Sequence, residues 1–119
     1  MSTGPENSVK NACLELLALH GIFAFRLNSG AFSGNYKGRK WFMRCHSLGK
    51  GAADILALPK TTGNALGYVI PLWIETKCKG KKQRPEQRQF EAWVRDLGHD
   101  YLLVDDPATL MEWLKERGL

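Results

Sequence analysis

The stretch 67-GYVIPLWIETK-77 joins an apolar run, rich in β-branched and aromatic residues, to a carboxylate and an amine. This composition predicts a strand. Because alternate residues of a strand point to the same face, Glu75 and Lys77 are expected to project side by side near its end. The ordinary structural interpretation is an ion pair on a solvated edge. The apolar character of the remaining strand favours a functional site instead.

A second strand-like run, 52-AADILAL-58, places another carboxylate, that of Asp54, upstream of this stretch. Carboxylates are the hard oxygen ligands that Mg²⁺ prefers in proteins. A lysine beside them is a compact charge that can hold a water or a phosphate oxygen. The combination predicts metal-assisted hydrolysis of a phosphodiester. Short motifs of this kind are common, so their surroundings decide the interpretation.

The composition indicates one small globular domain. The chain has 119 residues, 44% of them hydrophobic, which fits a single domain over 1–119 with residues 1–6 as a flexible tail. No apolar run approaches the ~20 residues of a membrane helix, and no secretory signal is visible. We therefore expect a cytoplasmic protein, in a bacterium or a phage-infected host. Three widely spaced cysteines indicate reduced thiols, and Cys45-His46 lacks the partners of a zinc site.

Positive charge is clustered in two segments on either side of the Asp54 run. The formal net charge is +5, and clustered charge of this sign indicates a polyanionic partner such as nucleic acid. A merely solubilising surface is the alternative, but basic segments on both sides of an acidic pair favour nucleic acid. The predicted DNA-binding residues are Lys37, Arg39, Lys40, Arg44 and Lys50 in the first segment and Lys79, Lys81, Lys82 and Arg84 in the second.

The hydrophobic patterns predict an α/β chain in the order α-β-β-β-α-β-α, a mixed α+β sheet flanked by helices. A first helix is expected from Asn7 or Ser8 to Leu19 or His20, and strands over 22–28, 39–45, 52–58 and 67–77, with a glycine-rich turn region over 29–38. A strand is expected over 101–104.

Two further helices are predicted after the second basic segment. Pro85 begins the first of them, which ends at Gly98 and is expected to bury Phe90, Trp93, Val94 and Leu97. The last begins at Pro107 after a cap at Asp105 or Asp106, with Leu110, Met111 and Leu114 inward.

The motifs 51-GAADI-55, 73-WIETK-77 and 84-RPEQRQF-90, in this order of elements, resemble the PD-(D/E)xK nuclease superfamily. Within it the chain is most similar to the VRR-NUC (virus-type replication-repair nuclease) family, over nearly its whole length. The resemblance implies a restriction-endonuclease-like core. One departure is Ala53, where the superfamily usually has proline; this loses backbone rigidity but no ligand.

The resemblance also implies roles for individual residues. Asp54 and Glu75 would ligate Mg²⁺ or Mn²⁺, and Lys77 would position the attacking water. The Thr76 backbone carbonyl would be a further ligand, Glu15 of the first helix would help to hold the metal, and Gln87 would line the site. Judged from its position in the helix alone, Glu15 could equally be an ordinary surface residue.

The leading functional hypothesis is a structure-selective DNA endonuclease that acts as a homodimer on four-way junctions, like a Holliday-junction resolvase. Stand-alone members of the similar family are homodimers with this activity. Cleavage of flaps or other branched DNA, a non-catalytic nucleic-acid-binding module with the same fold, and RNA as substrate remain open. The run 41-WFM-43 and the helix of Trp113 are candidate dimer contacts, with core packing as the alternative for each.

Overall fold

The computed structural model describes residues 4–27, 31–44, 51–60 and 69–119, and for Pro5, 31–36 and 41–44 it describes the backbone alone. Its helices are α1 (Pro5–Leu19), α2 (Pro85–Asp96) and α3 (Pro107–Glu116), and its strands are β1 (Phe23–Arg26), β2 (Ala31–Tyr36), β3 (Arg39–Arg44), β4 (Ile55–Leu58), β5 (Leu72–Thr76) and β6 (Asp100–Val104). In this part of the chain, no helix is both long and apolar enough to cross a membrane.

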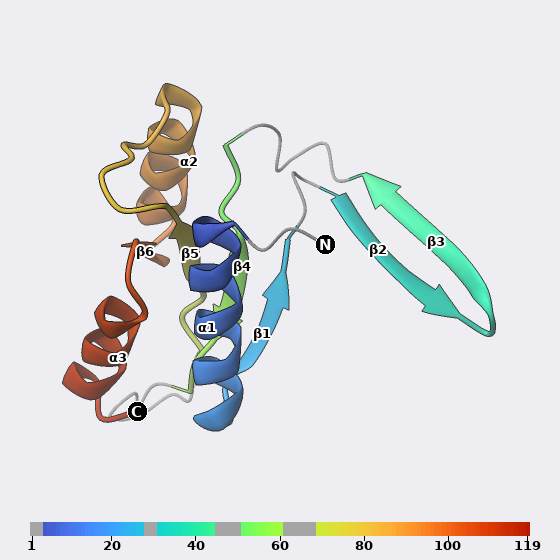
Figure 1. Ribbon diagram of the computed structural model, residues 1–119, viewed down its shortest axis with the longest axis horizontal. Coiled ribbons are helices and arrows are strands. Elements are labelled where there is room, and N and C mark those ends of the chain that lie inside the picture. Colours follow the sequence, from blue (N-terminus) through green and yellow to red (C-terminus); the bar gives the residue numbers. More distant parts are fainter. Residues whose placement is uncertain (1–3, 28–30, 45–50, 61–68) are drawn as a thin grey trace.

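The main sheet is mixed, with strand order β1-β4-β5-β6 (Figure 1). The pairs β1–β4 and β4–β5 are antiparallel, whereas β5 and β6 run parallel because α2 connects them. Without the separate β2–β3 pair, which includes the strand expected over 39–45, the order of elements is α-β-β-β-α-β-α. The predicted fold class is therefore confirmed.

The strands β2 and β3 form a separate two-stranded hairpin that projects from the body of the molecule (Figure 1). The prediction of a turn region over 29–38 is wrong for residues 31–36, which are extended and pair with β3. The turn itself is only Lys37 and Gly38, with φ values of 50° and 77°. Two successive positive φ angles give a tight turn whose twist suits a hairpin.

Hydrophobic residues cover both faces of the main sheet. On one face, α1 and α3 pack over β4, β5 and β6, with a core of Cys13, Leu17, Ile55, Ala57, Leu72, Ile74, Val104, Leu110, Trp113 and Leu114. On the other face, α2 contributes Phe90 and Val94 to a smaller cluster with Ala53 and Tyr101. The motif 51–55 therefore leads into β4 and the motif 73–77 overlaps β5, and these are the two central strands of the main sheet.

Three predicted core residues prove to be exposed. Trp93 and Leu97 are largely solvent-accessible because α2 buries only a narrow stripe, Gln87, Phe90 and Val94. In α3 the inward position predicted for Met111 belongs to Trp113, which is 8% exposed. Trp113 thus packs in the core rather than offering a dimer contact. The side chains of 41–43 lie outside the described residues.

Helix α1 begins earlier than predicted. Its N-cap is Gly4 and its first residue is Pro5, so Asn7 and Ser8 are helical, and residues 5 and 6 do not belong to a tail. Proline suits the first helical position, because its fixed φ is already helical and its missing N–H has no partner there. The added turn carries Glu6 to the edge of the sheet where the predicted site lies.

Candidate active site

The pairing of β4 with β5 brings the two predicted carboxylates together. Ile55 lies opposite Ile74 in an antiparallel register, so the next positions, Asp54 and Glu75, meet at the same end of the pair. The Asp54 backbone N–H donates to the Ile74 carbonyl at 3.0 Å, which extends the pairing by one residue. Lys77 follows directly after β5, and its N–H donates to the carbonyl of Val104 at 2.9 Å.

Thr76 orients the Asp54 carboxylate. The Thr76 backbone N–H and hydroxyl both donate to Asp54 Oδ2, at 2.8 and 2.9 Å. Thr76 is fully buried, so its hydroxyl has this contact in place of water. The two donors fix the carboxylate and leave Oδ1 directed elsewhere. The predicted role of the Thr76 backbone carbonyl as a metal ligand stays a prediction.

Gln87 orients the second carboxylate from the first turn of α2. Its Oε1 accepts a 2.8 Å hydrogen bond from the Arg84 backbone N–H, which can only donate. The amide nitrogen must then face the opposite way, and it donates to Glu75 Oε1 at 2.7 Å. Gln87 is 3% exposed, so this bridge is protected from water. The bridge leaves the second oxygen of Glu75, Oε2, for other contacts.

Glu75 is a buried carboxylate with one unused oxygen. The side chain is 2% exposed, and Oε2 has no hydrogen-bond partner among the described residues. Burial, with a smaller contribution from the Asp54 charge, raises the pKa of Glu75 from 4.5 to about 8. Lys77 opposes this shift in pKa without cancelling it. A solvated surface ion pair is therefore not the environment of Glu75.

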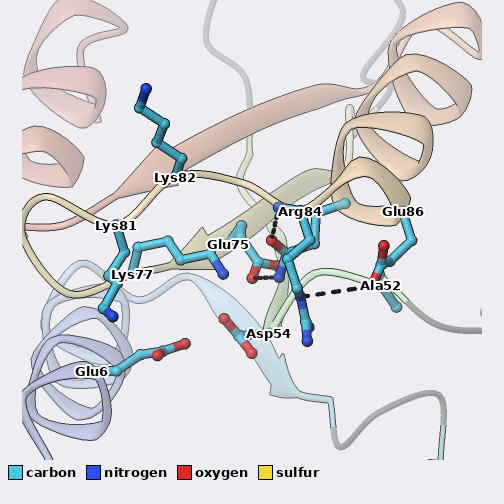
Figure 2. A pocket seen from close by; sticks show the side chains of 11 residues that line it. Glu6, Ala52, Asp54, Glu75, Lys77, Lys81, Lys82, Arg84 and Glu86 are labelled. Atoms are coloured by element: carbon cyan, nitrogen blue, oxygen red, sulfur yellow. Dashed lines mark hydrogen bonds and ion pairs between the residues drawn. The ribbon is translucent and has the colours of Figure 1, made fainter.

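A third carboxylate, from Glu6 of α1, joins the pair. Ligand oxygens of Glu6, Asp54 and Glu75 all lie within 4.8 Å of one another, and Figure 2 shows the carboxylates facing a common space beside the Lys77 amine. Three convergent carboxylates, one with an unpartnered buried oxygen, suit a hard divalent cation such as Mg²⁺ or Mn²⁺. The donor set of this chain therefore fits the predicted metal.

Glu6, not the predicted Glu15, is the helix carboxylate that reaches this group. Glu15 is exposed on α1. Nine helical positions separate the two residues, which at 3.6 residues per turn is two and a half turns. They consequently face opposite sides of α1, so Glu15 points away from the sheet edge. Pro5 is the sequence signal that could have identified Glu6, because proline favours the first position of a helix. A helix that begins there places Glu6 one turn before Lys10 and two turns before Cys13, on the inner face of α1.

Lys10 is a second residue that the sequence reasoning missed. It follows Glu6 by one turn of α1, and its Nζ lies 3.5 Å from Asp54 Oδ1. Only 13% of its side chain is exposed. The carboxylates thus have a partly buried lysine on the α1 side, in addition to Lys77 at the end of β5.

The carboxylates lie in an open pocket of about 690 Å³ at the ends of β4 and β5 (Figure 2). Acidic and basic side chains both line this pocket. The complete set of lining residues is Glu6, Gly51, Ala52, Asp54, Glu75, Lys77, Lys81, Lys82, Arg84, Glu86 and Gln87. Its acidic centre comes from the strands and α1, and its basic side comes from the loop before α2. Such a pocket can hold a cation at the centre and a phosphate against the cationic side.

The predicted DNA-binding residues whose side chains the structure describes lie in different parts of the molecule. Three of them, Lys81, Lys82 and Arg84, line the pocket. Lys79 turns toward Asp106, with 3.9 Å between Nζ and Oδ2. Exposed Lys37, Arg39 and Lys40 lie at the tip of the β2–β3 hairpin. The Arg44 side chain and the whole of Lys50 lie outside the described residues.

A comparison with solved structures finds a protein chain described as a VRR_NUC domain, which superposes with a TM-score of 0.60. The match covers 97% of this chain and 98% of the other, at 20% sequence identity. The chain has a VRR_NUC fold. No protein-family model matches the sequence, and a search of curated proteins finds no match.

This likeness to a VRR_NUC domain confirms the fold that the sequence motifs predicted. The match runs over almost the full length of both chains, so α1 and α3 belong to the shared architecture as well as the central strands. At this identity the likeness is one of fold. What the site does is therefore argued from its own residues.

Proposed function

We propose that this protein is a metal-dependent endonuclease that hydrolyses phosphodiester bonds of branched DNA. The observation that carries the proposal is Glu75 Oε2, a buried carboxylate oxygen without a partner among the described residues, beside Asp54 and Glu6. A protein that only binds nucleic acid gains nothing from three carboxylates in a basic pocket. They would repel phosphates unless a cation lay between them.

Three groups of this chain would hold Mg²⁺ or Mn²⁺: Asp54 through Oδ1, Glu75 through Oε2, and Glu6. A bound cation supplies Lewis-acid polarisation of the phosphoryl oxygen and lowers the pKa of water. Thr76 and Gln87 contribute by fixing the two strand carboxylates before substrate arrives, which removes the cost of ordering them. This accounts for a threonine and a glutamine at positions that could otherwise be apolar.

Lys77 acts on the substrate side of the pocket. Its ammonium borders the carboxylates (Figure 2) and can orient a water or stabilise negative charge that grows on the phosphate. Lys81, Lys82 and Arg84 contact flanking phosphates, which positions the nucleic acid without reading its sequence. The exposed charges at the hairpin tip extend this backbone contact away from the pocket.

We further propose that the protein acts as a homodimer on four-way junctions, in the cytoplasm. One small domain offers limited surface for recognising a branched shape. A two-fold pair of copies doubles the basic surface and holds two sites at a fixed separation. A four-way junction is itself close to two-fold symmetric, so a dimer would make paired incisions in opposing strands.

The test is a cleavage panel with Mg²⁺ or Mn²⁺, using labelled four-way, flap, splayed and linear DNA and a matched RNA duplex. The proposal predicts metal-dependent cleavage of branched DNA, strongest on the four-way junction, and a dimeric mass by light scattering. Metal-dependent binding without cleavage of any substrate would favour a non-catalytic binding module. A monomer that prefers flaps would overturn the junction and dimer proposals and leave the nuclease assignment intact.

A further inference from the structure

Lys10 occupies an unusual position for a lysine. Its side chain is 13% exposed, and its ammonium lies 3.5 Å from Asp54 Oδ1. Withdrawing an ammonium from water is costly unless a carboxylate pairs with it. Helix α1 presents Glu6 and Lys10 one turn apart on the same face, so one helix supplies both a carboxylate and a cation to the site.

The hydrogen bonds around the strand carboxylates leave one oxygen of each for a metal. Thr76 occupies Asp54 Oδ2 with two donors, and Gln87 occupies Glu75 Oε1 with one. The remaining oxygens are Asp54 Oδ1 and Glu75 Oε2. Lys10 pairs with Oδ1. The ammonium and an entering divalent cation therefore draw on the same oxygen atom.

We propose that Lys10 is a resident counter-cation of Asp54 that competes with the divalent cation and lowers the affinity of the site for metal in the DNA-free protein. This inference rests on the metal site of the proposed function. Lys10 neutralises one of the negative charges in the group, and it repels a second cation at close range. The lysine holds the Asp54 carboxylate in the absence of metal, and metal binding must displace it or share the oxygen with it.

The two ways in which Lys10 could matter give opposite results. If Lys10 only positioned Asp54, removing it would disorder a ligand and weaken metal binding. If Lys10 competes with the cation, removing it strengthens binding. The sign of the change in affinity therefore separates competition from a structural role.

The experiment is a calorimetric titration of Mn²⁺ into the full-length protein without DNA. Lys10→Met is expected to bind Mn²⁺ about tenfold more tightly than the wild type, the scale of a screened unit-charge interaction at this range. Lys10→Arg keeps the charge and is expected to retain wild-type affinity within about threefold. Lys115→Met, an exposed position near the end of α3, is the matched control and should leave the affinity unchanged.

Thermal unfolding provides a second measurement. Without metal, Lys10→Met leaves Asp54 without its ion-pair partner. The melting temperature of this variant should therefore fall below that of the wild type, and saturating Mn²⁺ should raise it by more than it raises the wild type. Lys10→Gln, which keeps a hydrogen-bond donor without the charge, replaces Lys10→Met if the latter fails to fold.

Metal affinity that is unchanged or weaker in both neutral variants would overturn the inference while leaving the nuclease proposal standing. If the wild type, Lys10→Met and Lys10→Gln all bind no Mn²⁺, the metal site itself is wrong, and this inference is wrong with it.

Discussion

Among single residues, Asp54 and Glu75 each have one carboxylate oxygen held by hydrogen bonds within the fold and a second oxygen outside those bonds. Thr76 and Gln87 do the fixing, and both are buried. A neutral hydrogen bond contributes only about 1 kcal/mol of net stability. The value of these contacts lies instead in geometry, because they hold the two carboxylates in place for the metal of the proposed function.

The first prediction compares two glutamates of α1. Glu6→Gln should weaken Mn²⁺ binding by about tenfold or more, since even outer-shell partners of a metal are worth about 10–100-fold. Glu15→Gln should leave binding within twofold of the wild type, because Glu15 faces away from the carboxylate group. Calorimetry on both variants decides. The reverse order of effects would restore Glu15 as the helix ligand and contradict the assignment of Glu6.

The second prediction is a pH dependence of stability without metal. Folding raises the pKa of Glu75 from 4.5 to about 8 through burial, so the folded state binds more protons than the unfolded state between these values. Stability should therefore fall as pH rises from about 5 to about 8. Melting temperatures in EDTA should show this loss, and Glu75→Gln should reduce it. A wild-type stability that rises over the same range would contradict the buried environment of Glu75.

Among the elements, the segment before β4 packs closely against the first turn of α2 at Gly51. Gly51 has a φ of +88°, and a Cβ there would collide with the backbone of Glu86 in the first turn of α2. The close approach therefore needs a residue without a side chain. It brings the segment before β4 against the start of α2, which carries Gln87 to Glu75.

The third prediction follows from this contact. Gly51→Ala should lower the melting temperature and weaken metal binding. Gly80→Ala is the matched control, because Gly80 has a similar φ of +83° but open space around its Cβ position. The control should lose only the conformational cost of a side chain at positive φ, about 1 kcal/mol, which corresponds to about 4 °C for a chain of 119 residues. Equal losses for the two variants would mean that the contact with Glu86 is unimportant.

The fourth prediction concerns the loop before α2. Lys81 and Lys82 line the pocket, whereas Lys79 turns toward Asp106. The double variant Lys81→Ala/Lys82→Ala should reduce the log–log salt slope of DNA binding by about 1.8, at roughly 0.9 per phosphate contact. Lys79→Ala should change it much less. Titrations at several salt concentrations measure this, and equal slopes for all three proteins would place these lysines away from the DNA.

The sequence predicted helices and strands correctly where the hydrophobic pattern was strong. It failed where the position of a turn determined which residues form a strand. The strands that lead to Asp54 and Glu75 were evident because their apolar runs enter a buried sheet. Strand β2 (Ala31–Tyr36) was missed because Gly34 and its polar neighbours suggested a turn, although Lys37-Gly38 supplies the tight turn that the hairpin needs. Its pairing with β3 is a contact between segments that no local composition reveals.

The candidate site was predictable to the extent that it lies on the strands. Asp54, Glu75 and Lys77 follow from alternation at strand ends and from the family resemblance. Glu6 was missed because the helix start was placed after it, at Asn7 or Ser8. Lys10 lay inside the predicted helix, but no local pattern showed that it would lie beside Asp54. Their approach to Asp54 depends on how α1 packs across the sheet, which is a tertiary contact. The same limit applies to Met111 and Trp113, whose order of burial depends on the tilt of α3.

At the scale of the whole molecule, the body and the hairpin have different tasks. The main sheet and its helices hold the carboxylates, while the β2–β3 hairpin extends basic residues away from them (Figure 1). An isolated two-stranded hairpin is marginally stable in water. The proposed function accounts for such an arm as a backbone contact for DNA that reaches beyond the pocket.

Metal-dependent cleavage of DNA by these carboxylates can be tested with one paired measurement. Labelled four-way-junction DNA is incubated with Mg²⁺, and cleavage and binding are measured in the same samples for the wild type and for Asp54→Asn. We expect the wild type to cleave and Asp54→Asn to lose more than about a hundredfold in rate, exceeding the effect of outer-shell partners, while DNA binding persists or tightens. If Asp54→Asn cleaves at a rate near that of the wild type, the carboxylates are not the catalytic metal site.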